Sequence, residues 1–179
     1  MNNKWALATP LAALVLAACG PSGQQSANST TQPPPSAEAT TPVPAGSVHS
    51  VLAGVVNSAT LSGQACSLDS VDGNYAAQVT LSKGKAHVFR GWLENNQQKP
   101  AGEFQFVLAG TQDFGIPAAT GVQRPDVASG QNNPALANAG FNFSVNLDSL
   151  PSGDYAIRFL MQTSGKTYWC DAKKTVVLK

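Results

Sequence analysis

The feature that most constrains the fold of this chain is an alternation of apolar and polar residues with a period of two. In Glu103–Leu108, Phe141–Leu147 and Tyr155–Phe159, every second residue is large and apolar. Successive side chains of a strand point to opposite faces, so each segment predicts a strand with one buried face and one wet face. Five more segments have the composition of strands: Cys66–Val71, Ala76–Leu81, Ala86–Leu93, Thr167–Asp171 and Thr175–Leu178. We therefore predict about eight strands in an all-β, antiparallel β-sandwich.

The segment Ala86–Leu93 is expected to lie at the centre of this sandwich. It is rich in β-branched and aromatic residues and has turn-forming residues on both sides. Gly91 is unusual inside a strand, where glycine marks a bulge or a close approach of two backbones. Trp92 follows it and offers the largest side chain for filling a core. We expect Trp92 at the centre of the core.

The alternation stops between Gly110 and Gly140, so we expect a long connection there. Asp126 is placed to cap one turn of helix through Val127–Ala128. Arg124 is expected to pair with Asp126 or with a neighbouring carbonyl. The connection is thus predicted to contain one short helical turn and no strand.

Residues 1–18 have the layout of a signal peptide. Lys4 supplies the positive start, and Trp5–Ala17 is an apolar segment too short to span a membrane. The segment Leu16–Cys19 resembles the lipobox of bacterial lipoproteins. This resemblance implies cleavage before Cys19, a diacylglycerol on its sulfur and an acyl chain such as palmitate on its amine. Gly20 implies transport to the outer membrane, with the periplasmic or surface face left open; an ordinary signal peptide with an incidental cysteine is the alternative.

Residues 19–47 are expected to be a disordered tether behind the lipidated cysteine. The segment after Cys19 has no aromatic residue and one charge, Glu38, among Pro, Ser, Thr, Gln and Ala. Such a composition buries too little apolar surface to offset the entropy of ordering. The β-sandwich domain is expected over residues 48–179. At its start, His49–Ala65 fits either a short helix or an edge strand, and we favour the strand.

Two cysteines remain once Cys19 is acylated. They are Cys66 and Cys170, and an exported chain enters an oxidising compartment. A disulfide between them is the default expectation, and it would close a loop of almost the whole domain. Two reactive thiols are the alternative, although neither lies in a C-x-x-C motif or beside a histidine.

Four short motifs resemble an immunoglobulin-like β-sandwich module of bacterial envelope proteins. They are Leu68–Gly73, Arg90–Leu93, the Arg-Pro-Asp-Val run of Gly121–Ala128, and Gly140–Phe141. The resemblance covers about Cys66 to Lys179. It implies an immunoglobulin-like fold and a place among appendages of cell-surface and polysaccharide-related proteins, and it implies no enzymatic activity.

The sequence offers little for catalysis, and we expect no enzyme, cofactor or metal site. His49 and His87 are its only histidines, and they lie on different segments. We favour a structural role for His87 over a ligand or base. Asp69 and Asp72–Gly73 supply too few carboxylates for calcium, so a turn is favoured. No hydrolase, zinc or phosphate-loop motif occurs.

Three residues are candidates for binding. If Cys170 points inward, its neighbour Trp169 points outward, where it either covers a loop or meets a ligand. Arg124 and Asp126 would suit sugar binding or would pin the long connection. Removal of Lys4 from eleven basic residues leaves ten against ten acidic residues, which excludes an attractive field for nucleic acid.

These features together predict a non-enzymatic, outer-membrane lipoprotein. Its sandwich is expected to bind an unknown envelope protein or polysaccharide. The alternative is a periplasmic inhibitor or immunity lipoprotein that blocks a cell-wall hydrolase, with the segment Gln131–Asn138 inserted into the enzyme.

Overall fold

The computed structural model describes residues 42–51, 58–61 and 65–179. The compact unit Glu38–Lys179 contains all of the described residues. The expected signal peptide, the lipidation site Cys19 and most of the expected tether lie outside them.

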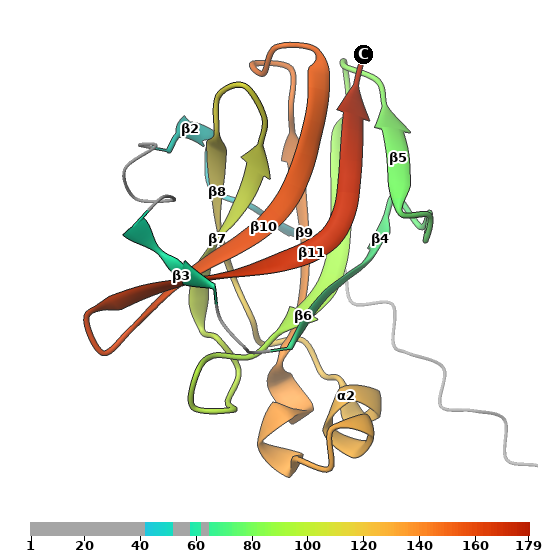
Figure 1. Ribbon diagram of the computed structural model, residues 1–179. Helices are drawn as coiled ribbons and strands as arrows, with labels where there is room; N and C mark the ends of the chain where they lie inside the picture. Colours follow the sequence, from blue (N-terminus) through green and yellow to red (C-terminus); the bar gives the residue numbers. More distant parts are fainter. Residues whose placement is uncertain (1–41, 52–57, 62–64) are drawn as a thin grey trace, which may run out of the picture. The chain divides into compact units, whose positions relative to one another are not determined.

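Two β-sheets face each other across one core (Figure 1). The four-stranded sheet has the order β1 (Val43–Pro44), β9 (Gly140–Asn146), β6 (Ala86–Leu93), β4 (Cys66–Val71). The seven-stranded sheet has the order β2 (His49–Ser50), β8 (Phe114–Ala119), β7 (Glu103–Ala109), β10 (Gly153–Thr163), β11 (Lys166–Leu178), β3 (Thr60–Leu61), and β5 (Gln78–Leu81) also pairs with β11. The expected all-β sandwich is confirmed.

The expected strands are found with small changes. Cys66–Val71 and Ala86–Leu93 have the expected bounds, and the strand predicted at Ala76–Leu81 is β5. The two strands predicted at the C-terminus are one strand, β11, whose pairing with β10 shifts register between Ala156 and Arg158. Of the ambiguous segment after His49, the structure describes β2 and β3 as short edge strands.

Two features of the sheets depart from the prediction. The connection predicted to lack strands contains β8, which escaped notice because Gly115 and Pro117 interrupt its pattern. Pro117 lacks an N–H, and β8 tolerates it because only the two-residue strand β2 lies beyond this strand. The pairings β1–β9, β3–β11 and β5–β11 are parallel, so the sheets are mixed instead of wholly antiparallel.

The centre of the core is a cluster of phenylalanine rings, and the expectation that Trp92 fills it is wrong. The ring centroids of Phe89 and Phe106 lie 4.8 Å apart, and those of Phe89 and Phe143 lie 5.5 Å apart. Phe89 and Leu93 of β6 are buried in this core, so the alternation of the strand turns Trp92 outward. Trp92 is half-buried against a second cluster of Val127, Leu136 and Ala139.

The glycine that precedes Trp92 is required by a close approach. A Cβ on Gly91 would lie 2.6 Å from Cζ of Phe141 and would collide with the carbonyl of Ser67. The expected close approach is therefore confirmed. The bulge lies in the partner strand, where Leu68 and Ser70 face consecutive residues of β6 and Asp69 is extra.

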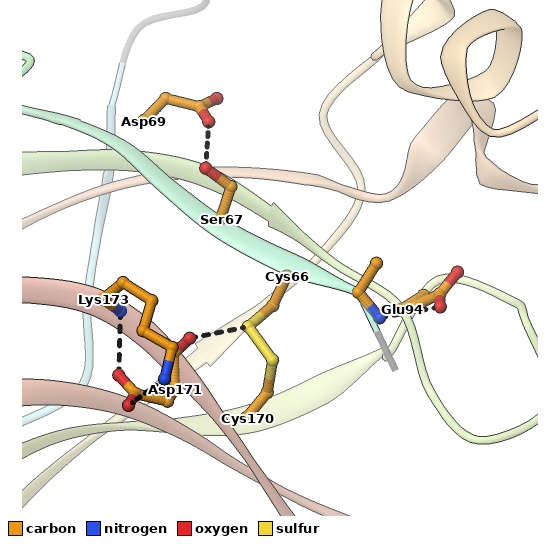
Figure 2. Close-up of a disulfide and its surroundings, with 8 residues drawn as sticks. Cys66, Ser67, Asp69, Glu94, Cys170, Asp171 and Lys173 are labelled. Carbon is orange, nitrogen blue, oxygen red and sulfur yellow. Dashed lines mark hydrogen bonds and ion pairs between the residues drawn. A yellow bond between two sulfur atoms is a disulfide. The ribbon is translucent and has the colours of Figure 1, made fainter. Parts of the chain in front are cut away.

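The expected disulfide joins the two sheets (Figure 2). Cys66 begins β4, Cys170 lies in β11, and their Cα atoms are 6.4 Å apart across 104 residues of sequence. The carbonyl of Asp171 lies beside the Cys66 sulfur, and Lys173 donates to the Asp171 carboxylate. The disulfide is thus placed to hold the two sheets together.

Candidate functional site

Arg124 and Asp126 lie together outside the four-stranded sheet. Helix α2 (Pro125–Gly130) begins directly after Arg124. The Nε and Nη2 atoms of Arg124 donate to the two carboxylate oxygens of Asp126 at 2.9 and 2.7 Å. Its Nη1 atom donates to Asp69 of β4 at 2.6 Å, and Ser67 donates to the other oxygen of Asp69. All three nitrogens of the guanidinium are therefore engaged.

This pairing corrects the expected role of Asp126. The helix has Arg124 at its N-cap and no side-chain cap, and Asp126 lies within its first turn. The hydrogen bond from Arg124 lowers the pKa of Asp126 below its usual value, and the pKa of Arg124 is raised by the same bond. Arg124 and Asp126 thus attach the long connection to β4 through Asp69, and this arrangement favours the pinning role.

Trp169 lies on the outer side of the other sheet. Cys170 points across the sandwich to Cys66, so Trp169 points away from the core. The guanidinium carbon of Arg158 lies 4.9 Å from the centroid of the Trp169 ring, and Asp171 faces Arg158 in register. Trp169 is half-buried, whereas its register partner Leu61 is 59% exposed. The structure therefore places Trp169 on a different face from Arg124 and Asp126.

A row of side chains crosses the outer face of the seven-stranded sheet in register. It runs Leu61, Trp169, Leu160, Gln105, Pro117 through β3, β11, β10, β7 and β8. Residues directly opposite on neighbouring strands share a face, so these five side chains form one continuous line. The row combines apolar surface with one amide.

A groove of about 1020 Å³ lies at the β8 end of this row. Leu160, Gln105 and Pro117 of the row line it, and Trp169 is next to Leu160. It passes β8 and reaches Asn142 and Phe143 of the other sheet. Its polar lining includes His49, Ser50, Glu103, Thr120 and Gln162.

Gln105 is the residue that distinguishes this groove. Its Oε1 atom is buried and has no hydrogen-bond partner among the residues that the structure describes. Gly115 allows close packing beside it, because a Cβ there would lie 2.6 Å from Cγ2 of Val51 and 3.1 Å from both Oε1 of Gln105 and Nε2 of His49. A buried acceptor without a donor costs free energy, which a ligand that donates a hydrogen bond would recover. This role could not be predicted from the sequence, because Gln105 resembles any polar residue on the wet face of a strand.

His87 has the structural role that we favoured. Its side chain is 1% exposed, and its Nδ1 and Nε2 atoms lie 2.7 Å from Asp72 and 2.9 Å from the Ser82 carbonyl. Partial burial raises the pKa of Asp72, but the hydrogen bonds from His87 and the Val88 amide outweigh it, and the pKa lies below its usual value. Asp72 and Gly73 have φ angles of 51° and 78°, as the expected turn requires.

A second cleft of about 440 Å³ lies beside the segment Gln131–Asn138. The segment continues from α2 into the 3-10 helix η1 (Pro134–Asn138), in which Leu136 is buried. Amide side chains of Gln97, Gln98 and Gln131 line the cleft with the buried carboxylate of Glu94. The Oε1 atom of Glu94 already accepts the Ala65 amide at 2.8 Å.

Neither a metal cluster nor a membrane-spanning helix is found in the described part of the chain. No group of three or more His, Cys, Asp or Glu residues in these ranges is placed to hold a metal ion. No helix there is long and apolar enough to cross a membrane. In the comparisons with known proteins, no family model, no curated protein and no solved structure matches the chain.

Proposed function

We propose that this protein is a non-enzymatic binding module held at the outer membrane by lipids on Cys19. The outer face of its seven-stranded sheet, from Trp169 to the groove at Gln105, binds an envelope component. The single observation that supports this most is the unpaired Oε1 atom of Gln105 in a groove beside a half-buried tryptophan.

The chemistry of this face favours binding over catalysis. His49 and Glu103 line the groove, but His49 Nδ1 contacts the Ser47 carbonyl at 3.4 Å, and no carboxylate of the described residues forms a hydrogen bond or ion pair with His49. Catalysis by an acid and a base needs groups held within hydrogen-bond reach of each other and of substrate. Amides and an aromatic ring instead supply the contacts of a recognition site.

A capture experiment tests the binding face. The full chain carrying Cys19→Ser, which keeps the disulfide but lacks the lipid, is immobilised and incubated with an envelope extract, and retained proteins and glycans are identified. We expect one component to be retained and to fall at least about tenfold with Trp169→Ala, because binding energy concentrates in a few aromatic residues. Tyr75→Ala is the matched control, since Tyr75 is 76% exposed on the turn after β4. Equal retention by all three chains would refute the proposal.

The lipid anchor has its own test. Cys19→Ser should move the protein from the membrane fraction to the soluble fraction, and the mature wild-type protein should carry the mass of a diacylglycerol on its first residue. A wild-type chain that is soluble after cleavage would instead support the ordinary signal peptide.

The inhibitor function is a second candidate, favoured by the amide-lined cleft beside Gln131–Asn138. A protein that contacts a hydrolase through this end should lose protection against lysis when Gln131 and Asn132 are both changed to Ala. Both residues are exposed and precede η1, so the fold should persist. Unchanged protection would remove this candidate.

A further inference from the structure

We propose that the groove on the seven-stranded sheet takes a neutral polysaccharide, with Gln105 as a residue that determines specificity. This inference rests on the proposed function and adds the chemical class of the ligand. It follows from the charge, the hydrogen-bonding groups and the apolar surface of the groove.

The charges of the groove disfavour an anionic ligand. Glu103 is the carboxylate among its described lining residues, and these include no Lys or Arg. Arg158, on strand β10 of the same sheet, already lies over the Trp169 ring and faces Asp171. Proteins bind sulfated, phosphorylated or uronic-acid groups through Arg and Lys. An acidic polysaccharide would meet Glu103 here without a compensating charge.

The hydrogen-bonding groups suit sugar hydroxyls. Gln105 and Gln162 each carry an acceptor and two donors. Ser50 and Thr120 accept hydrogen bonds from Gln112 and from the Gly102 amide, and each hydroxyl also carries a proton that it can donate. A sugar hydroxyl also donates and accepts. It can therefore supply the donor that Oε1 of Gln105 lacks.

The apolar surface suits a sugar chain better than a protein. Pro117 is exposed and offers C–H surface beside Gln105, and the half-buried Trp169 extends the apolar surface along the row. Leu160, between Gln105 and Trp169, is only 6% exposed. From β8 to β11 the row spans about 14 Å, enough for a few linked sugar rings. A protein interface needs a contiguous apolar centre. The exposed large apolar residues of the described chain are Leu61 in β3 and Tyr75 on the turn after β4.

The test uses glycans released from the cell envelope and separated by anion exchange into neutral and acidic fractions. Each fraction is passed over the immobilised full chain carrying Cys19→Ser. We expect retention of material from the neutral fraction, reduced about tenfold by Gln105→Met, which has a similar volume but cannot replace the hydrogen bond. Gln98→Met, in the second cleft, is the matched control and should bind normally.

Reversing the charge of one lining residue tests the preference for neutral glycans and leaves the buried residues unchanged. Glu103 is exposed, so Glu103→Lys should leave folding intact and raise retention of the acidic fraction. Preferential retention of the acidic fraction by the parent chain, lost in Gln105→Met, would overturn the neutral class while the proposed function stands. Capture of a protein and no glycan, again dependent on Gln105, would overturn the glycan inference alone. Retention that depends on neither Gln105 nor Trp169 would overturn both.

Discussion

The outer faces of the two sheets differ in whether their polar side chains have hydrogen-bond partners within the fold. Outside the four-stranded sheet, Arg124 engages Asp69 and Asp126 with three nitrogens, so its hydrogen-bonding capacity is used within the fold. On the seven-stranded sheet, Arg158 lies over Trp169, and the nearby Gln105 keeps a buried acceptor without a donor. The first face is thus tied into the fold by hydrogen bonds, whereas the second is the face that we propose binds a ligand.

The disulfide joins the two sheets. Its removal should therefore lower the stability of the whole sandwich more than any other change, without favouring one outer face over the other. Replacing Cys66 and Cys170 together by Ala should lower the free energy of unfolding by about 4 kcal/mol, because the bond closes a loop of about 100 residues. Urea denaturation of wild type and variant measures this loss. A loss below about 1 kcal/mol would show that the link contributes little.

The two half-buried tryptophans, Trp92 and Trp169, allow the roles of the two outer faces to be tested separately. Trp92→Ala should cost about 3 kcal/mol, because Trp92 packs against Val127, Leu136 and Ala139. Trp169→Ala should cost about 1 kcal/mol, since it loses mainly the contact with Arg158. Denaturation should therefore show the larger loss of stability for Trp92→Ala, and envelope capture should show the larger loss of binding for Trp169→Ala. The same order in both measurements would contradict the comparison.

Arg124→Ala should cost about 2 kcal/mol and leave binding unchanged. The variant removes charge-assisted hydrogen bonds and leaves Asp69 without its cation. Arg124→Lys keeps the charge but not the paired geometry, so it should recover part of the stability. Lost capture by a folded Arg124→Ala protein would make this face part of the binding site.

A smaller effect is expected from pH at the turn beside His87. The pKa of Asp72 is lower in the folded protein, so its ionised form stabilises the fold above its unfolded pKa of about 4, and this contribution is lost as the pH falls further. Asp72→Asn should lower stability at pH 7 and make the loss between pH 5 and pH 3 shallower. Denaturation at several pH values measures both slopes, and identical slopes would contradict this role.

The sequence was informative where one local pattern determines the structure. Alternation in strands such as Phe141–Leu147 identified the sandwich, and two remaining cysteines identified the disulfide. It failed where the outcome depends on neighbouring strands. Pro117 concealed β8, because the sequence does not show that the short strand β2 pairs only with Phe114 and Gly115. Trp92 points outward because Phe89 and Leu93 occupy the inner face.

The candidate site was less predictable for the same reason. The outward direction of Trp169 follows from its place next to Cys170, and the pairing of Arg124 with Asp126 follows from their spacing. The involvement of Asp69 depends on the register of a distant strand. Whether Oε1 of Gln105 has a hydrogen-bond partner depends on side chains from other strands, so it can be seen only in the folded structure.

The proposed binding face can be tested directly by hydroxyl-radical footprinting of Trp169 and Trp92 in one protein. The Cys19→Ser chain is oxidised with and without its retained envelope component, and oxidation of each tryptophan is measured by mass spectrometry. The two residues report on opposite faces under identical conditions. We expect the bound component to protect Trp169 and leave Trp92 unchanged. Protection of Trp92 with no change at Trp169 would contradict the assignment of the binding face.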